Sequence, residues 1–328
     1  MTPPRFDILC IGNAIVDVVA RTDDAFLSKH GMRKGGMALI DAASAAALYA
    51  AMPPGVESSG GSAANTAAVA AGLGAKVAYL GKVADDQLGE VFRHDITAAG
   101  VHFPSRPLLG GAPTARCLIL VTPDAQRTMN TFLGACVTLG EADVDDAVVA
   151  DAAVTYLEGY LFDPPAAQAA FRRAAAAAHA AGRKVALTLS DAFCVDRHRG
   201  AFRELVGGHV DILFANETEI CSLYEANEFS LAAEAARRDV GLAVLTRSEA
   251  GSVILTQEHT IAIKAAPAQV VDTTGAGDAY AAGFLAALTA GKSLEISGRL
   301  GSAAAAAAIG QYGARPATDL RRLAASVV

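Results

Sequence analysis

Short apolar segments alternate with alanine-rich, helix-like segments along most of the chain, and this alternation restricts the possible folds more than any other feature. The apolar segments are rich in Val, Ile and Leu, as is typical of strands buried on both faces. Strands that are joined by helices run parallel, and helices then cover both faces of the sheet. The sequence therefore predicts an α/β fold with a mostly parallel central sheet. Its expected strands are 6–11, 77–80, 154–157, 185–189, 212–215 and 243–246, and its expected helices are 63–73, 87–98, 165–181 and 279–288.

Two segments, 15–41 and 101–133, break this alternation. The first contains no convincing helix before Asp41, and the second is rich in proline. Both contain strand-like runs, at 15–20, 37–40, 115–121 and 128–133. We expect these runs to form a small β-sheet that projects from the core, although the pattern does not fix how they pair.

The hydropathy of the chain is high, with 52% hydrophobic residues and a mean hydropathy of +0.33. A membrane-spanning helix needs roughly 18 to 20 consecutive apolar residues. Polar or charged residues interrupt every long run, and even the richest stretch, 166–181, contains Arg172 and Arg173. We therefore expect no membrane partner and a globular protein in which alanine side chains pack the layers closely.

The charge and the cysteines exclude further classes. A net charge of −7 and the absence of Trp argue against a broad nucleic-acid surface, which needs clustered basic residues and often aromatic platforms. The five cysteines are odd in number and include no C-x-x-C pair, so a disulfide framework is not expected. This pattern, together with an N-terminus that lacks a signal-peptide pattern, predicts a cytoplasmic protein.

The strongest local signal is the segment 270–280, where an apolar pair leads into a glycine-rich turn and then into an apolar helix. Small residues at 275–277 let the backbone approach a ligand, and the N–H groups of a helix N-terminus favour an anion such as phosphate. Asp278 could accept a proton from an alcohol that attacks the phosphorus. The alternative is an ordinary helix with an acidic first turn after a turn that Asp and Gly favour.

Three further groups of polar residues allow both a functional and a structural interpretation. The segment 60–65 opens a helix, so Asn65 could bind a hydroxyl, or Ser62 could cap that helix. Asp17 could chelate two sugar hydroxyls or face solvent. The segment 216–219 follows a predicted strand, where carboxylates could hold Mg²⁺ through water, or Asn216 could cap a helix.

In order and spacing, these segments resemble the signatures of the ribokinase-like (PfkB-type) carbohydrate kinase family. The segment 272–278 is similar to the C-terminal signature of the family, and 60–65 together with 81–89 is similar to its N-terminal signature. Residues 216–219 resemble its N-x-x-E motif. Within the family, 12–17 and 60–66 look most like adenosine kinase and its bacterial sugar-kinase relatives.

The resemblance implies a ribokinase-like three-layer α/β/α domain over residues 1–328, with a small β-sheet lid formed by about 14–41 and 102–134. It implies Asp278 as the catalytic base and an anion hole at Gly275, Ala276 and Gly277. The residues implied in substrate binding are Asn13, Asp17, Gly61, Ser62 and Asn65. Those implied in nucleotide binding are Asn216, Glu219, Thr246, Ser248 and Gly251. Glu219 would also hold Mg²⁺ through water, and Asp272 and Thr274 would bind a monovalent cation.

We therefore expect an ATP-dependent kinase that uses Mg²⁺ and K⁺ and phosphorylates a primary hydroxyl of a nucleoside, with adenosine favoured. Two alternatives remain: a kinase of ribose, fructose or a keto-deoxy sugar acid, and a non-catalytic nucleoside-binding regulatory protein on the same fold. The protein would be a monomer or a homodimer formed through the lid. Ser248 replaces a glycine that is common in the family. Phe103 and Phe132 are the candidates for a lid aromatic that stacks on a base.

Overall fold

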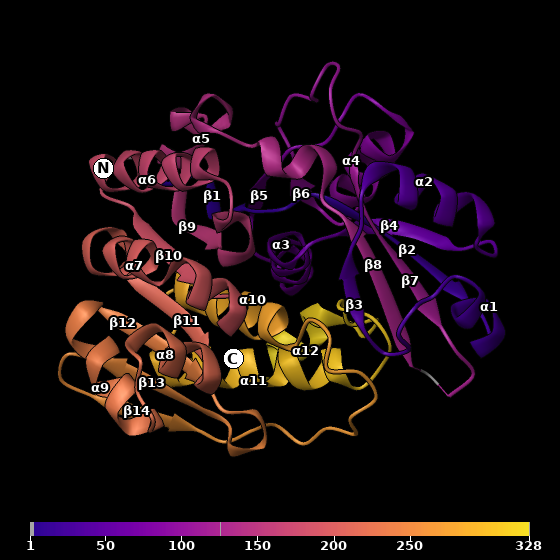
Figure 1. Cartoon of the computed structure of the whole chain (residues 1–328). Coiled ribbons are helices and arrows are strands. Elements are labelled where there is room, and N and C mark those ends of the chain that lie inside the picture. The colour runs from indigo at the N-terminus through magenta and orange to yellow at the C-terminus, as the bar shows by residue number, and fades with distance from the viewer. Residues whose placement is uncertain (1–2, 125, 328) are drawn as a thin grey trace.

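The computed structural model describes residues 3–124 and 126–327. Residues 1–2, 125 and 328, which the predicted domain and lid include, lie outside the described residues. Figure 1 shows a large sheet flanked by helices and a separate small sheet beside it. The large sheet has nine strands in the order β14-β13-β12-β11-β10-β9-β1-β5-β6. Its strands are β1 (Phe6–Ile11), β5 (Val77–Leu80), β6 (Val101–His102), β9 (Ala152–Glu158), β10 (Lys184–Thr188), β11 (Ile212–Asn216), β12 (Leu242–Thr246), β13 (Ser252–Thr256) and β14 (Thr260–Ile263).

The large sheet is mostly parallel, as the sequence predicts. Neighbouring strands from β6 to β12 pair in parallel, whereas near the other edge β13 pairs antiparallel with both β12 and β14. None of the helices in the described part of the chain has the length and apolar character that a membrane span requires. The helices are α1 (Asp24–Lys29), α2 (Ala42–Ala51), α3 (Ser62–Leu73), α4 (Gln87–Ala98), α5 (Asp146–Ala150), α6 (Pro165–Ala180), α7 (Ala192–His209), α8 (Glu217–Tyr224), α9 (Phe229–Asp239), α10 (Ala276–Thr289), α11 (Leu294–Ile309) and α12 (Leu320–Val327).

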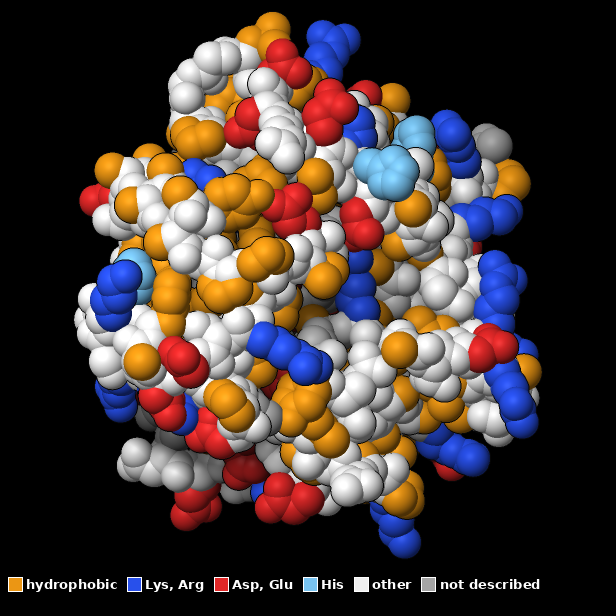
Figure 2. Space-filling view, turned by 90° about the vertical axis from the view of Figure 1, so that its right-hand side faces the viewer, with side chains coloured by type: hydrophobic (Ala, Val, Ile, Leu, Met, Phe, Trp, Pro, Cys, Tyr) orange, Lys and Arg blue, Asp and Glu red, His pale blue; other side chains and the backbone are white. Residues whose placement is uncertain are grey.

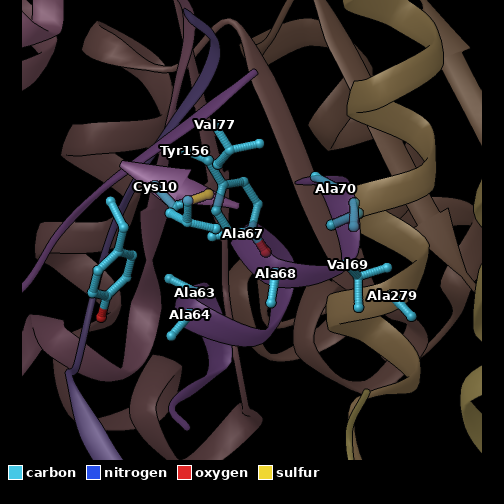
Figure 3. Packing of buried hydrophobic residues seen from close by; sticks show 14 of the residues in the cluster. Cys10, Ala63, Ala64, Ala67, Ala68, Val69, Ala70, Val77, Tyr156 and Ala279 are labelled. Carbon is cyan, nitrogen blue, oxygen red and sulfur yellow. The ribbon is translucent and has the colours of Figure 1, made fainter. Parts of the chain in front are cut away.

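Alternate residues of each central strand enter two separate cores. On one face, Cys10 and Tyr156 pack with α3, α10 and α11. On the other face, Leu9 and Leu157 pack with α6, α7, α8 and α9. Figure 3 shows Cys10 and Tyr156 against the alanines of α3, whose small side chains let this helix lie close to the sheet.

The small sheet has five strands in the order β3-β8-β7-β2-β4. The four runs expected from the sequence form β2 (Ile15–Arg21), β3 (Met37–Leu39), β7 (Ala115–Val121) and β8 (Arg127–Phe132). A fifth strand, β4 (Val56–Gly60), was not expected; it pairs antiparallel with β2. Figure 2 views the molecule from this side, where hydrophobic side chains are interspersed among charged ones of both signs.

The expectation of no helix before Asp41 is wrong, because α1 forms at Asp24–Lys29. Asp23 caps this helix by accepting a hydrogen bond of 2.8 Å from the backbone N–H of Phe26. Only Leu27 is buried in it, so the helix lacks the repeated apolar positions that reveal a helix in a sequence.

Candidate functional site

A cavity of about 1630 Å³ lies between the two sheets. Its wall includes residues at or just after the carboxyl ends of the parallel strands β1, β9, β10, β11 and β12: Asn13, Glu158, Thr188, Asn216 and Thr246. Ligands of parallel sheets gather at this edge. Its opposite wall is the inner face of the small sheet, and the N-termini of α3 and α10 meet it from the side. Every residue that the resemblance implies as the base, in the anion hole, or in substrate or nucleotide binding lines this cavity.

The glycine-rich turn forms the N-terminus of α10. Gly275 is its N-cap, with a φ of 76°, and no side chain caps the first N–H groups of the helix. A Cβ atom at position 275 would lie 2.6 Å from the backbone of Ala314, so both the φ and the contact require glycine. The uncapped N–H groups at a helix N-terminus suit an anion.

Asp278 lies in the first turn of α10, and α3 holds both of its carboxylate oxygens. Ser62 donates from Oγ to Oδ1 at 2.6 Å, and Asn65 donates from Nδ2 to Oδ2 at 3.4 Å. Burial raises the pKa of Asp278 to about 6, while these hydrogen bonds and the Arg315 guanidinium oppose the rise. A carboxylate in this state is largely ionised at neutral pH and can accept a proton.

Asn13, Asp17 and Gly61 surround the same end of the cavity. Gly61 has a φ of 99°, and a Cβ there would lie 2.0 Å from the carbonyl oxygen of Asn13, which explains the glycine. The carboxyl group of Asp17 lies against Gly60 in the same way, at 2.5 Å from a Cβ built there. Burial raises the pKa of Asp17 to about 6 against the opposing charges of arginine side chains.

Asn216 and Glu219 form a reciprocal capping box at the start of α8. Asn216 accepts from the N–H of Glu219 at 2.9 Å, and the Glu219 carboxylate accepts from the N–H of Asn216 at 2.9 Å. The motif therefore caps a helix, which was the structural interpretation of 216–219. Glu219 is buried, and burial raises its pKa to about 7. A carboxylate has more than two acceptor positions, so water-mediated contact with Mg²⁺ fits the capped state as well.

Thr246, Ser248 and Gly251 line the cavity beside this capping box. Ser248 has a φ of 48°, in the left-handed region that favours glycine. The position at which the family commonly has glycine therefore has a glycine-like backbone here. The adjoining run 302–309 lies in α11, and Ser302, Ala305, Ala306 and Ile309 line the cavity with small or apolar side chains.

Asp272 and Thr274, the expected monovalent-cation ligands, are already bound to one another and to a basic side chain. The Asp272 carboxylate accepts from the N–H and Oγ1 of Thr274 and from the N–H of Gly313, and it forms an ion pair with Arg127 of β8. Arg127 also donates to Thr274 at 3.1 Å. These contacts hold the pKa of Asp272 at about 2. A guanidinium thus lies where a potassium ion was expected, and the residues present do not fit that ion. Elsewhere in the described ranges, no cluster of three or more His, Cys, Asp or Glu side chains could hold a metal.

The two candidate lid aromatics are not at the site. Phe103 is buried against Tyr79 and Phe92 in the core, and neither Phe103 nor Phe132 is among the lining residues. Two exposed aromatic side chains that the sequence did not single out, Tyr160 and Phe193, line the cavity on the side of the large sheet.

Glu158, Arg127 and Arg315 are charged residues of the site that sequence reasoning missed. Glu158 is 1% exposed, and burial raises its pKa to about 7 in spite of hydrogen bonds from Asn13 and Ala63. Its position at the carboxyl end of a predicted strand was a usable signal. Nothing local marks Arg127 or Arg315, because both act through contacts with distant segments.

Comparison with known proteins places this geometry in one family. The model of the pfkB family of carbohydrate kinases matches residues 6–320. The structure of adenosine kinase from Sinorhizobium meliloti is 56% identical, with a TM-score of 0.89 over 99% of this chain and 100% of that chain. A probable sugar kinase from Rhizobium etli is 51% identical, with a TM-score of 0.90 over 99% and 100% of the two chains. Adenosine kinase from Saccharomyces cerevisiae is 29% identical over 95% of this chain and 96% of its own length.

Proposed function

The chain belongs to the pfkB family of carbohydrate kinases, which transfer phosphate to an alcohol, and from that premise we propose that it transfers the γ-phosphate of ATP to the primary hydroxyl of a nucleoside, adenosine foremost. One observation carries the proposal: Asp278, a carboxylate with a pKa of about 6, lies at a helix N-terminus whose first N–H groups no side chain caps. A base and an anion site are thus held on one turn of one helix.

The residues have distinct roles in the proposed transfer. The acceptor alcohol lies among Asn13, Asp17 and Asn65, and Asp278 accepts its proton as the alcohol oxygen attacks the phosphorus. The N–H groups of residues 275–277 stabilise the charge on the phosphoryl oxygens. When ATP carries Mg²⁺ into the site, this ion adds to that stabilisation. The large-sheet end of the cavity, at Asn216, Glu219 and Thr246, with Ser248 and Gly251 beside them, binds the nucleotide.

The cavity, at about 1630 Å³, exceeds the roughly 300–1,000 Å³ of a site for one small molecule, so it has room for a nucleotide together with an acceptor of either class. One feature of this cavity favours a nucleoside as the acceptor. The small sheet lines it with apolar side chains, among them Val19, Ile119 and Met129. An apolar wall suits a nucleobase, whereas a free sugar presents hydroxyls on all sides. In this scheme the small sheet, formed by β2, β3, β4, β7 and β8, closes over the acceptor as a lid.

A sugar kinase is the second candidate, because a probable sugar kinase is 51% identical over nearly the whole chain. We place the enzyme in the cytoplasm, since its five cysteines are free thiols that suit a reducing compartment.

An ADP-release assay with adenosine, ribose, fructose and a keto-deoxy sugar acid tests the proposal. We expect turnover of adenosine above the others, and we expect Asp278→Asn to lower kcat by about 10²–10⁴-fold with little change in ATP binding. Turnover of ribose or fructose without adenosine contradicts the nucleoside assignment. Wild-type turnover by Asp278→Asn contradicts the role of the base.

A further inference from the structure

Two asparagines at the acceptor end of the cavity each contact a charged side chain, and the two charges have opposite signs. Asn13 donates from Nδ2 to Oε1 of Glu158 at 2.7 Å. Asn65 accepts at Oδ1 from Nε of Arg315 at 3.0 Å. Asn13 and Glu158 are almost fully buried, with 3% and 1% exposure.

These side chains determine how each carboxamide is oriented. A carboxamide has a donor end and an acceptor end, a guanidinium only donates, and both carboxyl oxygens of Glu158 accept hydrogen bonds here. Glu158 therefore holds the NH₂ group of Asn13 and leaves its Oδ1 for a ligand. Arg315 holds the carbonyl oxygen of Asn65 and turns its NH₂ group toward Asp278.

Two orphaned polar atoms in this network show what a ligand would supply. Across the described ranges, Oδ1 of Asn13 and Nη2 of Arg315 are buried and lack a hydrogen-bond partner. The first is an acceptor and the second is a donor. A hydroxyl group can donate to the one kind of atom and accept from the other, which an ether or a C–H group cannot. Leaving such groups unpaired is costly, so a ligand that satisfies them is favoured.

We propose that Glu158 and Arg315 are positioning residues that set the opposite polarities of Asn13 and Asn65 and thereby select an acceptor with a hydroxyl beside them. This inference rests on the proposed function, which places the acceptor at this end of the cavity. Neither residue touches the reacting atoms, and we propose that both set this selectivity through the asparagines.

A purely structural role makes a different prediction. Glu158 also accepts from the N–H of Ala63 at 2.8 Å and from the N–H of Asn13 at 3.3 Å, and Arg315 pairs with Asp95 at 3.3 Å. If Glu158 and Arg315 served only to stabilise the fold through these contacts, substituting either residue would lower the stability of the protein. It would then reduce the turnover of every acceptor by the same factor. Selectivity between an alcohol and its deoxy analogue separates the two cases.

Glu158→Gln is the decisive variant, because its orientation is also fixed. Both backbone N–H groups point at the Oε2 position of Glu158, so the glutamine carbonyl must lie there and its NH₂ group must face Asn13. Asn13 then turns its own carbonyl to that NH₂ group and presents its NH₂ group to the ligand. The variant therefore inverts the polarity of Asn13 at constant shape.

The experiment measures kcat/KM for pairs of acceptors: adenosine with 2′- and 3′-deoxyadenosine, and ribose with 2-deoxyribose. We expect the preference of the wild type for the alcohol to fall by about tenfold or more in Glu158→Gln. We expect a similar loss in Arg315→Met and a smaller one in Arg315→Lys, which keeps a donor-only group. Glu204→Gln, which removes a surface carboxylate paired with Arg172 at 3.7 Å, controls for charge and should keep the wild-type preference.

The possible outcomes distinguish a failure of the positioning roles from a failure of the proposed function. Wild-type turnover with an unchanged preference in Glu158→Gln and Arg315→Met refutes the positioning roles and leaves the proposed function intact. Turnover of neither adenosine nor ribose by the wild type refutes the proposed function together with the inference that rests on it.

Discussion

Gly283→Ala tests whether close contact between α10 and α11 shapes this site. A Cβ atom at position 283 would lie 2.7 Å from the carbonyl oxygen of Leu300 and 2.9 Å from the Cα and N atoms of Gly301. These are backbone atoms, so no side chain can rotate away, and the two helices must separate. Such overpacking costs about 1–3 kcal/mol, and the better helix propensity of alanine returns about 0.5–1 kcal/mol. We expect a net loss of up to about 2.5 kcal/mol in the free energy of unfolding.

The matched control is Gly207→Ala in α7. A Cβ atom there meets nothing within 4 Å, so only the propensity gain remains, and we expect stabilisation by about 0.5–1 kcal/mol. Chemical denaturation of the wild type and both variants gives the two values, provided that the m-value is unchanged. A Gly283→Ala protein as stable as Gly207→Ala would refute the reasoning. Because α10 carries Asp278 and α11 lines the cavity, we also expect Gly283→Ala to lower kcat/KM for ATP.

Three further predictions concern the pocket. The kcat/KM of the enzyme should rise with pH through about 6, because Asp278 (pKa about 6) ionises there. The free energy of unfolding of the ligand-free protein, by contrast, should fall as the pH rises from about 4 to 7. The fall follows because Asp278 and Glu158 bind more protons when folded than when unfolded; thermal unfolding with no loss over this window would contradict it. Replacing K⁺ by choline should leave kcat unchanged, because Arg127 already neutralises Asp272, and strong K⁺ stimulation would contradict this. Ser248→Gly should raise the free energy of unfolding by about 0.5–1 kcal/mol, because it relieves a left-handed φ.

The sequence misses β6, β13 and β14 of the large sheet. It predicts the other six strands well because they are buried on both faces. A continuous apolar run is then the only pattern that a strand can have, and it stands out between helices. The strand β4 of the small sheet has no such apolar run. Its sequence is polar apart from Val56, and it becomes a strand through its pairing with β2. Elements whose conformation depends on a distant partner leave little trace in their own residues.

The same distinction holds within the site. Glycine-rich turns and capping boxes are local, so 272–278, 60–65 and 216–219 could be found from spacing alone. Glu158 and Arg315 are single charged residues whose neighbours in the sequence form no motif. Their contacts with Asn13 and Asn65 are what indicates a role. Arg315 and Asn65 are separated by 250 positions in the chain, so only the fold reveals the pair.

The sequence places a carboxylate, Asp278, in the turn that we expect to bind an anion, although the two negative charges would repel each other. The fold explains this placement. Asp278 belongs to the first turn of α10, but Ser62 and Asn65 of α3 hold its two oxygens. Its charge is thus engaged by the hydroxyl and amide donors of α3, while no side chain caps the first N–H groups of α10, where we propose that phosphate binds. Burial raises its pKa to about 6, which makes it a better proton acceptor than an exposed carboxylate. Since α3 and α10 pack on the same face of the sheet through small side chains, alanine and glycine in these helices let the two N-termini meet closely enough to share one carboxylate. The alanine content of the chain is therefore part of how Asp278, the proposed base, is positioned.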